Sequence, residues 1–485
     1  MANSIQTPYT AIISDLHLCE EQIPEPRRPL WKRYKSRDFF FDAEFEVFLN
    51  QIQEKAGGQP VELVLNGDIF DFDSIMSLPD SPTFRISWAE RIRGLNAEED
   101  KSAFKMSKII EDHPLWFSSL REFLLRGNQA IFIFGNHDVE LHFPLVQQEI
   151  LKALNLPEEK KSHVRFNEWF YISNQDTLIE HSNQYDPYCV CQDPLHPFVL
   201  KYNRVAVRLA FGNLAGRYLI NGMGYFNPHS DSNFIMSATE YFRFFRKYLL
   251  TTQPLIMWTW FWGSIVTLYQ SFVDRLLPEI RDPLTLEDRI EDIARKANAT
   301  PRIVRELREL TAYPATSSPI TIARELWLDR AFLVLIALVS ILQLFVYVKL
   351  VYSISLFWIF LPLFIFVPFF IFYAKSVRPS TAAYKEPKEH ILQLTSQIAR
   401  VKRVVYGHTH IVRHEMIEDV EHLNCGTWSP AFSDVECTKP IGRKTYVWIE
   451  PGPEGRQAQL LEFDGGKTRE FTGLEPQLSD AEGAD

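Results

Sequence analysis

The sequence predicts a layered α/β protein whose core is divided by a helical insertion and an apolar helical hairpin. Three observations lead to this prediction. Five short apolar runs with β-forming residues each end in side chains that bind metals. Between the fourth and fifth runs, aromatic, leucine and basic residues recur at helical spacing. Close before the fifth run, residues 331–373 contain a single charged residue, Lys349.

The composition restricts the class of protein. A chain of 485 residues is long enough for more than one domain. Its net charge of −10 argues against nucleic acid as a partner, because phosphate contacts need a basic surface. Five cysteines without regular spacing do not suggest a disulfide framework. The first residues have no basic segment followed by an apolar one, so we expect no signal peptide and a reducing cytoplasmic setting.

The five apolar runs are expected to be strands of one core. Their ends carry candidate ligands, namely Asp15 and His17, Asp68, Asn136 with His137 and Asp138, His181, and His408 with His410. Ligands at the carboxyl ends of strands meet at the rim of a sheet, where α/β proteins keep their sites. Gly67, Gly135 and Gly407 permit tight turns and close approach to a ligand. Each run alone is a weak signal, but the five in this order predict one metal centre.

Together these motifs resemble the calcineurin-like metallophosphoesterase family. Its pattern is DxH, GDxxD, GNHD or GNHE, a lone His and GHxH, and the chain reads "SDLHL", "NGDIFD", "GNHD", "IEHS" and "GHTH". The motifs frame residues 10–430, and the long gap between His181 and His408 marks an insertion. The resemblance implies a four-layer β-sandwich flanked by helices, with two divalent ions that activate a hydroxide and neutralise phosphoryl oxygens.

The resemblance also assigns the ligands. It implies one ion held by Asp15, His17 and His410, a second held by Asn136, His181 and His408, and Asp68 as the bridge between them. A mixed set of carboxylate, amide and imidazole donors suits Mn²⁺, with Fe²⁺ and Zn²⁺ as the alternatives.

Other residues near the motifs have expected roles. His137, paired with Asp138, is expected to be the acid for the leaving group or a phosphate contact. Asp71 orients a ligand or His137, or it caps a turn. Tyr185 and Asp186 touch the substrate, or they belong to the turn at Asp186-Pro187.

Residues 331–373 are too long for one membrane span and fit two spans that turn near "VKLVYSIS". Basic residues flank both ends, which by the positive-inside rule keeps both ends in the cytoplasm: Arg324 and Arg330 before, Lys375 and Arg378 after. The alternatives are a re-entrant hairpin, which also returns the chain to the side it left, and a buried hairpin of a soluble protein.

The remaining segments complete the predicted organisation. Residues 1–185 and 377–465 are the two parts of the catalytic domain, 186–328 a helical lid, 329–376 the hairpin and 466–485 an acidic tail. The lid faces the membrane, or its helices pack on each other. Residues 254–272 are rich in tryptophan, as in an interfacial belt. Charged helices are expected after Asp282-Pro283 and at Thr300-Pro301, and a β-hairpin within residues 445–463.

We therefore expect a membrane protein with its catalytic domain on the cytoplasmic side. Its expected partners are membrane lipid and a phosphorylated substrate at the membrane surface. The position of the lid resembles family members that cleave UDP-diacylglucosamine, so a nucleotide-linked lipid is one expected substrate. The alternatives are a membrane-localised phosphatase of proteins or small molecules, and a non-catalytic membrane scaffold.

Overall fold

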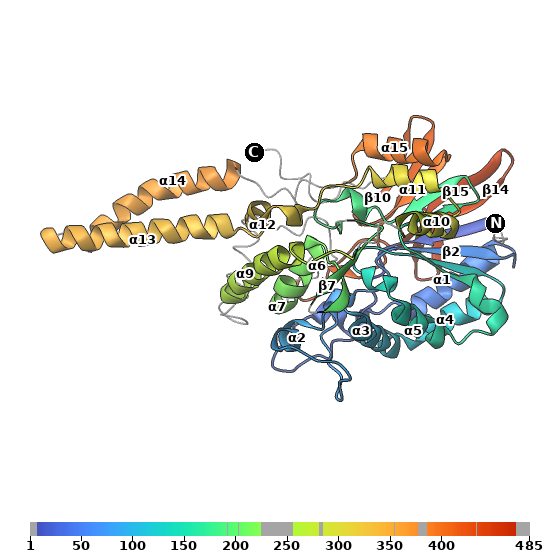
Figure 1. Ribbon diagram of the computed structural model, residues 1–485, viewed down its shortest axis with the longest axis horizontal. Helices are drawn as coiled ribbons and strands as arrows, with labels where there is room; N and C mark the ends of the chain where they lie inside the picture. Colours follow the sequence, from blue (N-terminus) through green and yellow to red (C-terminus); the bar gives the residue numbers. More distant parts are fainter. Residues whose placement is uncertain are drawn as a thin grey trace.

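The computed structural model describes residues 7–191, 193–201, 203–224, 256–280, 285–353, 355–376, 386–432 and 434–471. It has a mixed α/β architecture with two main sheets, and an apolar helix pair projects from one end (Figure 1). The α/β prediction is confirmed at this level.

The larger sheet has seven strands in the order β16-β15-β14-β1-β2-β3-β4. Strands β1 to β4 are parallel, and β14 to β16 add to the edge of β1 as antiparallel strands. The pairing of β14 with β15 is the hairpin predicted within residues 445–463. The bounds are β1 Tyr9–Ile13, β2 Val61–Asn66, β3 Gln129–Ile133, β4 Val164–Asn167, β14 Thr445–Gly452, β15 Gly455–Asp464 and β16 Lys467–Glu470.

The smaller sheet has five strands in the order β10-β11-β9-β6-β5. Its strands β6, β9 and β11 are parallel, so a strand before the insertion pairs directly with one that follows it. The bounds are β5 Phe170–Ser173, β6 Thr177–Glu180, β9 Arg403–Tyr406, β10 Val412–Ile417 and β11 Val420–Cys425. Two short pairs complete the strands, β7 Phe198–Lys201 with β8 Arg204–Val207 and β12 Ala431–Phe432 with β13 Pro440–Ile441.

The two sheets pack face to face, and helices cover both outer faces. Buried residues of both sheets form the core between them, among them Ile12, Val64, Ile179 and Val405. The larger sheet is covered by α1 Asp42–Lys55, α3 Glu99–Asp112, α4 Pro114–Leu125 and α5 Pro144–Leu154. The smaller sheet is covered by α10 Leu286–Lys296, α11 Pro301–Arg308 and α15 Glu389–Ala399 (Figure 1).

Helices α10 and α11 belong to this core although they lie in the segment predicted as a lid. Ile293 of α10 and Val304 of α11 are buried against the small sheet. Thr300 caps α11 by accepting a hydrogen bond from the Ile303 amide, as the Thr-Pro pair predicted. Burying each such side chain contributes about 1.5–3 kcal/mol. The described lid is therefore shorter than the predicted one.

The described part of the lid lies beside the larger sheet. It comprises α6 Phe211–Ala215, the π-helical turn η7 Gly216–Ile220, α7 Asn221–Met223, α9 Ile256–Arg275 and α12 Pro319–Glu325. A small apolar core, which includes Phe211, Ile322 and Leu328, joins α6 and α12 to the start of the helix pair. The amphipathic segment at 240–250, expected at a membrane surface, lies outside the described residues. Helix α2 Trp88–Arg93 and several short 3₁₀ turns complete the elements.

The apolar segment forms two helices, α13 Leu328–Val351 and α14 Phe360–Ser376, that lie side by side and project from the body (Figure 1). The Tyr373 hydroxyl donates to Asp329 Oδ2 at 2.9 Å where the pair meets the body. Among the described residues, only α13 is long and apolar enough to cross a membrane. Helix α13 ends at Val351, within the segment "VKLVYSIS" where the turn was predicted. The second helix is shorter than the expected span, because residues 356–359 form the 3₁₀ turn η10, Leu356–Ile359.

Candidate metal centre

The candidate ligands follow the carboxyl ends of parallel strands in both sheets. Asp15 follows β1, Asp68 follows β2, and His408 follows β9 of the smaller sheet. The loops are tied to each other by backbone hydrogen bonds, of which the His17 amide to Asp68 carbonyl bond measures 2.9 Å. The His181 ring binds the carbonyl of Asn66 through Nδ1 at 2.9 Å, which joins the two sheets at this rim.

The backbone is strained at five of these residues. Asp15, His17, Asp68, His408 and His410 all have positive φ, with values of 55°, 50°, 50°, 72° and 62°. Residues other than glycine enter this region at a cost of order 1–3 kcal/mol each, and they remain there only where the surroundings enforce it. Such concentration of strain in one place is typical of a functional site.

Three glycines keep the space around the ligands open. A Cβ atom on Gly67 would overlap the ring of His181, and Gly67 itself has a φ of +77°. A Cβ on Gly135 would overlap the carboxylate of Asp68, and one on Gly407 would overlap Ser14 Oγ. The glycines therefore serve close approach at all three turns, as the sequence predicted.

Asp15, His17 and His410 form the first cluster of ligand atoms. His17 Nε2 lies 3.3 Å from His410 Nε2. Asp15 Oδ1 lies 3.1 Å from His410 Nε2 and 3.9 Å from His17 Nε2. Two atoms that each bind one ion at about 2.1 Å are about 3.0–3.4 Å apart at octahedral or tetrahedral angles. The three side chains can therefore hold a divalent ion with little movement.

The second cluster comprises Asp68, His181 and His408, whose ligand atoms lie within 4.8 Å of one another. Asp68 Oδ2 is 3.1 Å from His181 Nε2. Burial opposes ionisation of Asp68, but His181 and His137 hold its pKa well below its usual value. The side-chain oxygen of Asn136 is buried and accepts no hydrogen bond from the described part of the chain. A polar atom buried in this way suits a metal ligand.

His137 faces two carboxylates that come from the loop after β2. Its Nδ1 lies 3.4 Å from Asp71 Oδ1 and 4.0 Å from Asp73 Oδ2. Burial works against protonation, yet Asp68 and Asp71 raise the pKa of His137 to about 10. Asp71 also caps the 3₁₀ turn η3, Phe72–Ser74, through the Ser74 amide. The two roles expected for Asp71 as alternatives therefore occur together.

The expected pairing of His137 with Asp138 is corrected by the structure. The Asp138 carboxylate accepts hydrogen bonds from the backbone amides of Gly135 at 2.6 Å and Ile69 at 2.7 Å. It is fully buried and fastens the loop after β3 to the loop after β2. Asp138 therefore has a structural contact, and Asp71 is the carboxylate that lies beside His137.

Asp186 lies beside a predicted metal ligand, whereas Tyr185 does not. Asp186 Oδ2 lies 3.1 Å from His408 Nε2, and Cys189 completes a third group of potential ligands with this pair. The Tyr185 hydroxyl instead donates to the buried Glu180 carboxylate at 3.0 Å.

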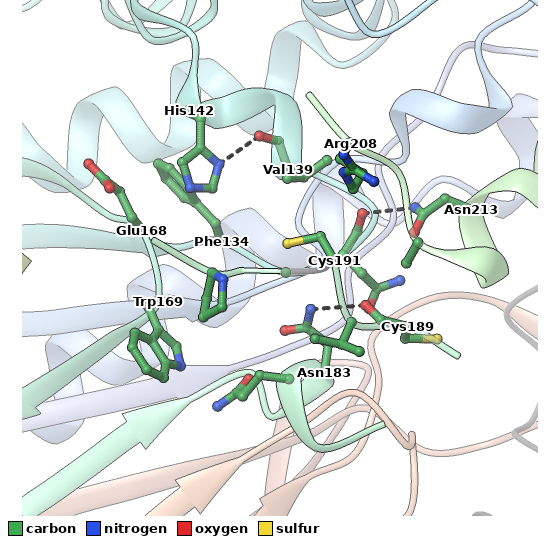
Figure 2. A pocket seen from close by; sticks show the side chains of 16 residues that line it. Phe134, Val139, His142, Glu168, Trp169, Asn183, Cys189, Cys191, Arg208 and Asn213 are labelled. Carbon is green, nitrogen blue, oxygen red and sulfur yellow. Dashed lines mark hydrogen bonds between the residues drawn. The ribbon is translucent and has the colours of Figure 1, made fainter. Parts of the chain in front are cut away.

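A cavity lies where the lid meets the core, and Asn136 and Cys189 form part of its wall. Arg208, which precedes the lid helices, and Asn213 of α6 also line it (Figure 2). The Arg208 guanidinium donates to the carbonyls of Asp274 and Leu277 at 3.2 and 3.0 Å, so that α9 is tied to the cavity wall. The cavity therefore lies between the candidate centre and the lid.

Asn213 of α6 connects the lid to the ligand loop. Its Nδ2 donates to the Asn136 carbonyl at 2.8 Å (Figure 2). The same nitrogen donates to Asp73 Oδ2 at 2.6 Å. Neither Asn213 nor Asp73 was predicted from the sequence. Asp73 could have been found from the sequence, because it lies two residues after the candidate Asp71 in "DFD". No sequence pattern pointed to Asn213, because it lies far along the chain from every metal-ligand motif.

We expect Asn213→Ala to weaken Mn²⁺ binding by roughly 10- to 100-fold, which is the effect of removing a group that orients a ligand. The substitution frees the Asn136 carbonyl and lets the ligand loop move. Calorimetric titration of the metal-stripped protein measures this change. Asn221→Ala is the matched control, because Asn221 lies in the same lid and donates to the Asp73 carbonyl at 2.7 Å instead of to the loop that carries Asn136 and His137. Equal weakening in both variants would contradict a specific role for Asn213.

The chain matches no protein-family model and no curated protein. The structure brings six of the seven predicted metal ligands together in groups of histidine and aspartate that can hold metal ions, namely Asp15, His17, Asp68, His181, His408 and His410.

Proposed function

We propose that this protein is a membrane-anchored phosphoesterase of the calcineurin-like metallophosphoesterase family that uses two divalent ions. The position of Asp68 carries the proposal. Its carboxylate belongs both to a group with His17 and His137 and to a group with His181 and His408. A carboxylate shared by neighbouring ligand sets is what a pair of ions about 3.5–4 Å apart requires.

The side chains fit two such ions. Asp15, His17 and His410 would hold one, Asn136, His181 and His408 the other, and Asp68 both. The mixture of oxygen and imidazole donors favours Mn²⁺, with Fe²⁺ or Zn²⁺ as alternatives. When bound, the pair supplies an activated hydroxide and offsets the charge of the phosphoryl oxygens.

The protein's own residues would orient the substrate and move the proton. His137 lies beside the second cluster, and its ring is 19% exposed, so it can reach the oxygen of a leaving group. The carboxylates of Asp71 and Asp73 lie 3.4 and 4.0 Å from Nδ1 of this ring and orient it. Asp138 and Asn213 fix the loop that carries both Asn136 and His137. Donation of a proton to the leaving oxygen is therefore the role proposed for His137.

The helix pair α13 and α14 would anchor the enzyme in the membrane. At about 1.5 Å per residue, α13 matches the ~30 Å thickness of the hydrocarbon layer. Most of its large apolar side chains are exposed, Leu338 and Leu342 among them. Strand β6 before the pair and β9 after it are neighbours in one sheet, so the chain must return to the side that it left. Arg324 and Arg330 favour the cytoplasmic side.

Reporter fusions test this topology. We expect reporters fused after residues 325 and 380 to lie on the cytoplasmic side, since both flanks are basic and the two strands must pair. Alkaline phosphatase and a fluorescent protein give opposite signals on the two sides of a bacterial inner membrane. Reporters on opposite sides would exclude the hairpin arrangement.

The proposed substrate is a phosphate or diphosphate ester at the membrane surface, and a nucleotide-linked lipid such as UDP-diacylglucosamine is the first candidate to test. The protein in detergent is stripped of metal, reloaded with Mn²⁺ and followed by phosphorus NMR on this lipid, on phosphate mono- and diesters and on a phosphopeptide. We expect two ions per chain and hydrolysis only after loading. Two bound ions without turnover of any substrate would point to a non-catalytic scaffold.

Metal loading is also expected to stabilise the fold. An ion at 100 times its Kd adds about 2.7 kcal/mol of stability, which for a protein of this size corresponds to a rise in Tm of roughly 3–5 °C. Differential scanning fluorimetry with and without Mn²⁺ measures the rise. We expect His408→Ala to reduce it and His422→Ala to leave it unchanged, because His422 is a fully buried imidazole in β11 outside the ligand groups. An equal reduction in both variants would contradict the assignment of His408.

A further inference from the structure

Helix α9 has its polar and apolar faces inverted. Ser264, Thr267 and Ser271, which are spaced three or four residues apart, are fully buried against the protein. The opposite face exposes five large aromatic side chains: Trp258, Phe261, Trp262, Tyr269 and Phe272. A helix at the surface of a soluble domain has the reverse arrangement, with apolar residues inside and polar residues outside.

Two of the three buried hydroxyls of α9 are satisfied within the helix itself. Thr267 Oγ1 donates to the Gly263 carbonyl and Ser271 Oγ to the Thr267 carbonyl, both at 2.8 Å. Ser264 Oγ is buried and has no hydrogen-bond partner among the described residues. The small size of the three side chains allows α9 to pack closely on η7. At Gly263 a Cβ atom would lie only 3.0 Å from the Tyr218 carbonyl. The inner face therefore supplies close packing, as small residues do between helices in membranes.

The exposed face has the composition of a lipid interface. Residues 256–273 carry no charged side chain, and they contain four tryptophans or tyrosines among the described positions: Trp258, Trp260, Trp262 and Tyr269. Trp258 and Trp262 stack with their ring centroids 6.2 Å apart. Protein-binding surfaces mix aromatic residues with arginine and hydrogen-bonding groups, whereas Trp and Tyr without charge are enriched at the level of lipid headgroups.

The position of α9 fits the same surroundings. It lies at the end of the body from which α13 and α14 project (Figure 1). If α13 crosses the bilayer, the surface of the membrane begins close to Leu328, beside this end of the body. The apolar surface of the helix pair therefore continues onto α9.

We infer that the outer face of α9 lies in the headgroup region of the bilayer as a second membrane contact, in addition to the hairpin. The inference rests on the proposed function for the anchoring by α13 and α14, but it does not depend on catalysis. Helix α9 packs on η7, and the adjoining α6 binds the ligand loop through Asn213. The lipid contact thus holds the cavity and the metal centre at the membrane surface, where a substrate with an acyl chain would enter.

Site-directed spin labelling of the full chain tests this inference. The variants Trp262→Cys and Tyr269→Cys report on α9, and Leu338→Cys reports on α13. Trp88→Cys is the matched control, because Trp88 of α2 is an exposed aromatic residue (77% exposed) away from the projecting helices. Each variant is labelled in vesicles of phosphatidylethanolamine and phosphatidylglycerol, and the signal from the five native cysteines is subtracted with the labelled wild type.

The ratio of collision rates with oxygen and with a water-soluble nickel chelate distinguishes the outcomes. We expect this ratio to be several-fold higher at residues 262 and 269 than at Trp88. A ratio equal to that at Trp88 would overturn the inference, and so would protection from both reagents, which would indicate a protein partner or a second copy. Lipid exposure at Leu338 alone would overturn the α9 contact and leave the anchor intact. Thermal unfolding of each variant verifies that it is folded.

Discussion

Asp68→Ala is expected to lower metal-dependent hydrolysis by at least about 10³-fold, the scale seen when an electrostatic contact to a developing charge is removed. Asp68 is 2% exposed, and its Oδ1 accepts the His137 amide at 2.7 Å while Oδ2 faces His181. Its removal leaves two ligand groups without their shared carboxylate. We therefore expect fewer than two bound ions in the variant, which inductively coupled plasma mass spectrometry measures.

The chain offers a matched control for this variant. Asp42 is buried and pairs with the buried His113, whose Nδ1 lies 2.8 Å from Asp42 Oδ1. Asp42→Ala thus removes an aspartate–histidine pair outside the ligand groups. We expect Asp42→Ala to lower Tm but to keep two ions and most of the activity per folded molecule. Retained hydrolysis in Asp68→Ala, with circular dichroism unchanged, would reject the proposed centre.

The strand ends were predictable because their physics is local. An apolar run such as "VELVLN" forms a buried parallel strand, and all residues of this strand are buried. A glycine and a ligand follow directly, so the ligand lies at the rim whatever the rest of the chain does. The same argument applies to Asp15 after β1 and His408 after β9. Knowledge of which strands are neighbours was not needed to place these residues together.

Roles that depend on side-chain direction could not be predicted in this way. Asp138 follows His137, and the resemblance to the metallophosphoesterase family implied that the two form a pair. In the structure its carboxylate turns to the amides of Gly135 and Ile69, because those buried donors would otherwise remain unsatisfied. Asn213 reaches the ligand loop from a lid helix, and this contact depends on tertiary packing alone.

The insertion illustrates the same division. The start of α11 at Thr300-Pro301 was set by local capping and was predicted correctly. Its place in the fold depends on the surface against which its apolar face packs. That face carries Val304 and Leu307, and it packs on the small sheet. Periodicity predicted the helix but not the surface that it covers. The shorter α14 has a similar cause, because the 3₁₀ turn at Leu356–Ile359 carries residues expected in the second span.

The second large effect is expected at His137. If this side chain protonates the leaving oxygen, its importance must depend on how poor the leaving group is. His137→Gln is therefore expected to slow the hydrolysis of alkyl phosphate esters by about 10²–10⁴-fold. Esters of p-nitrophenol should lose far less, because p-nitrophenolate departs without a proton. Steady-state kcat for both ester classes, with the same bound Mn²⁺ content, measures the difference.

The comparison of the two esters distinguishes the two roles expected for His137. A phosphate contact would act on the group common to both substrates, so that its loss would slow both esters equally. A proton donor acts only on the oxygen that differs. His163→Gln serves as control, because the His163 ring donates one hydrogen bond to the Asn128 carbonyl, 2.8 Å away and outside the ligand groups. An equal loss on both esters in His137→Gln would reject proton donation and retain phosphate binding, with Asp71 and Asp73 then holding a fixed positive charge at the centre.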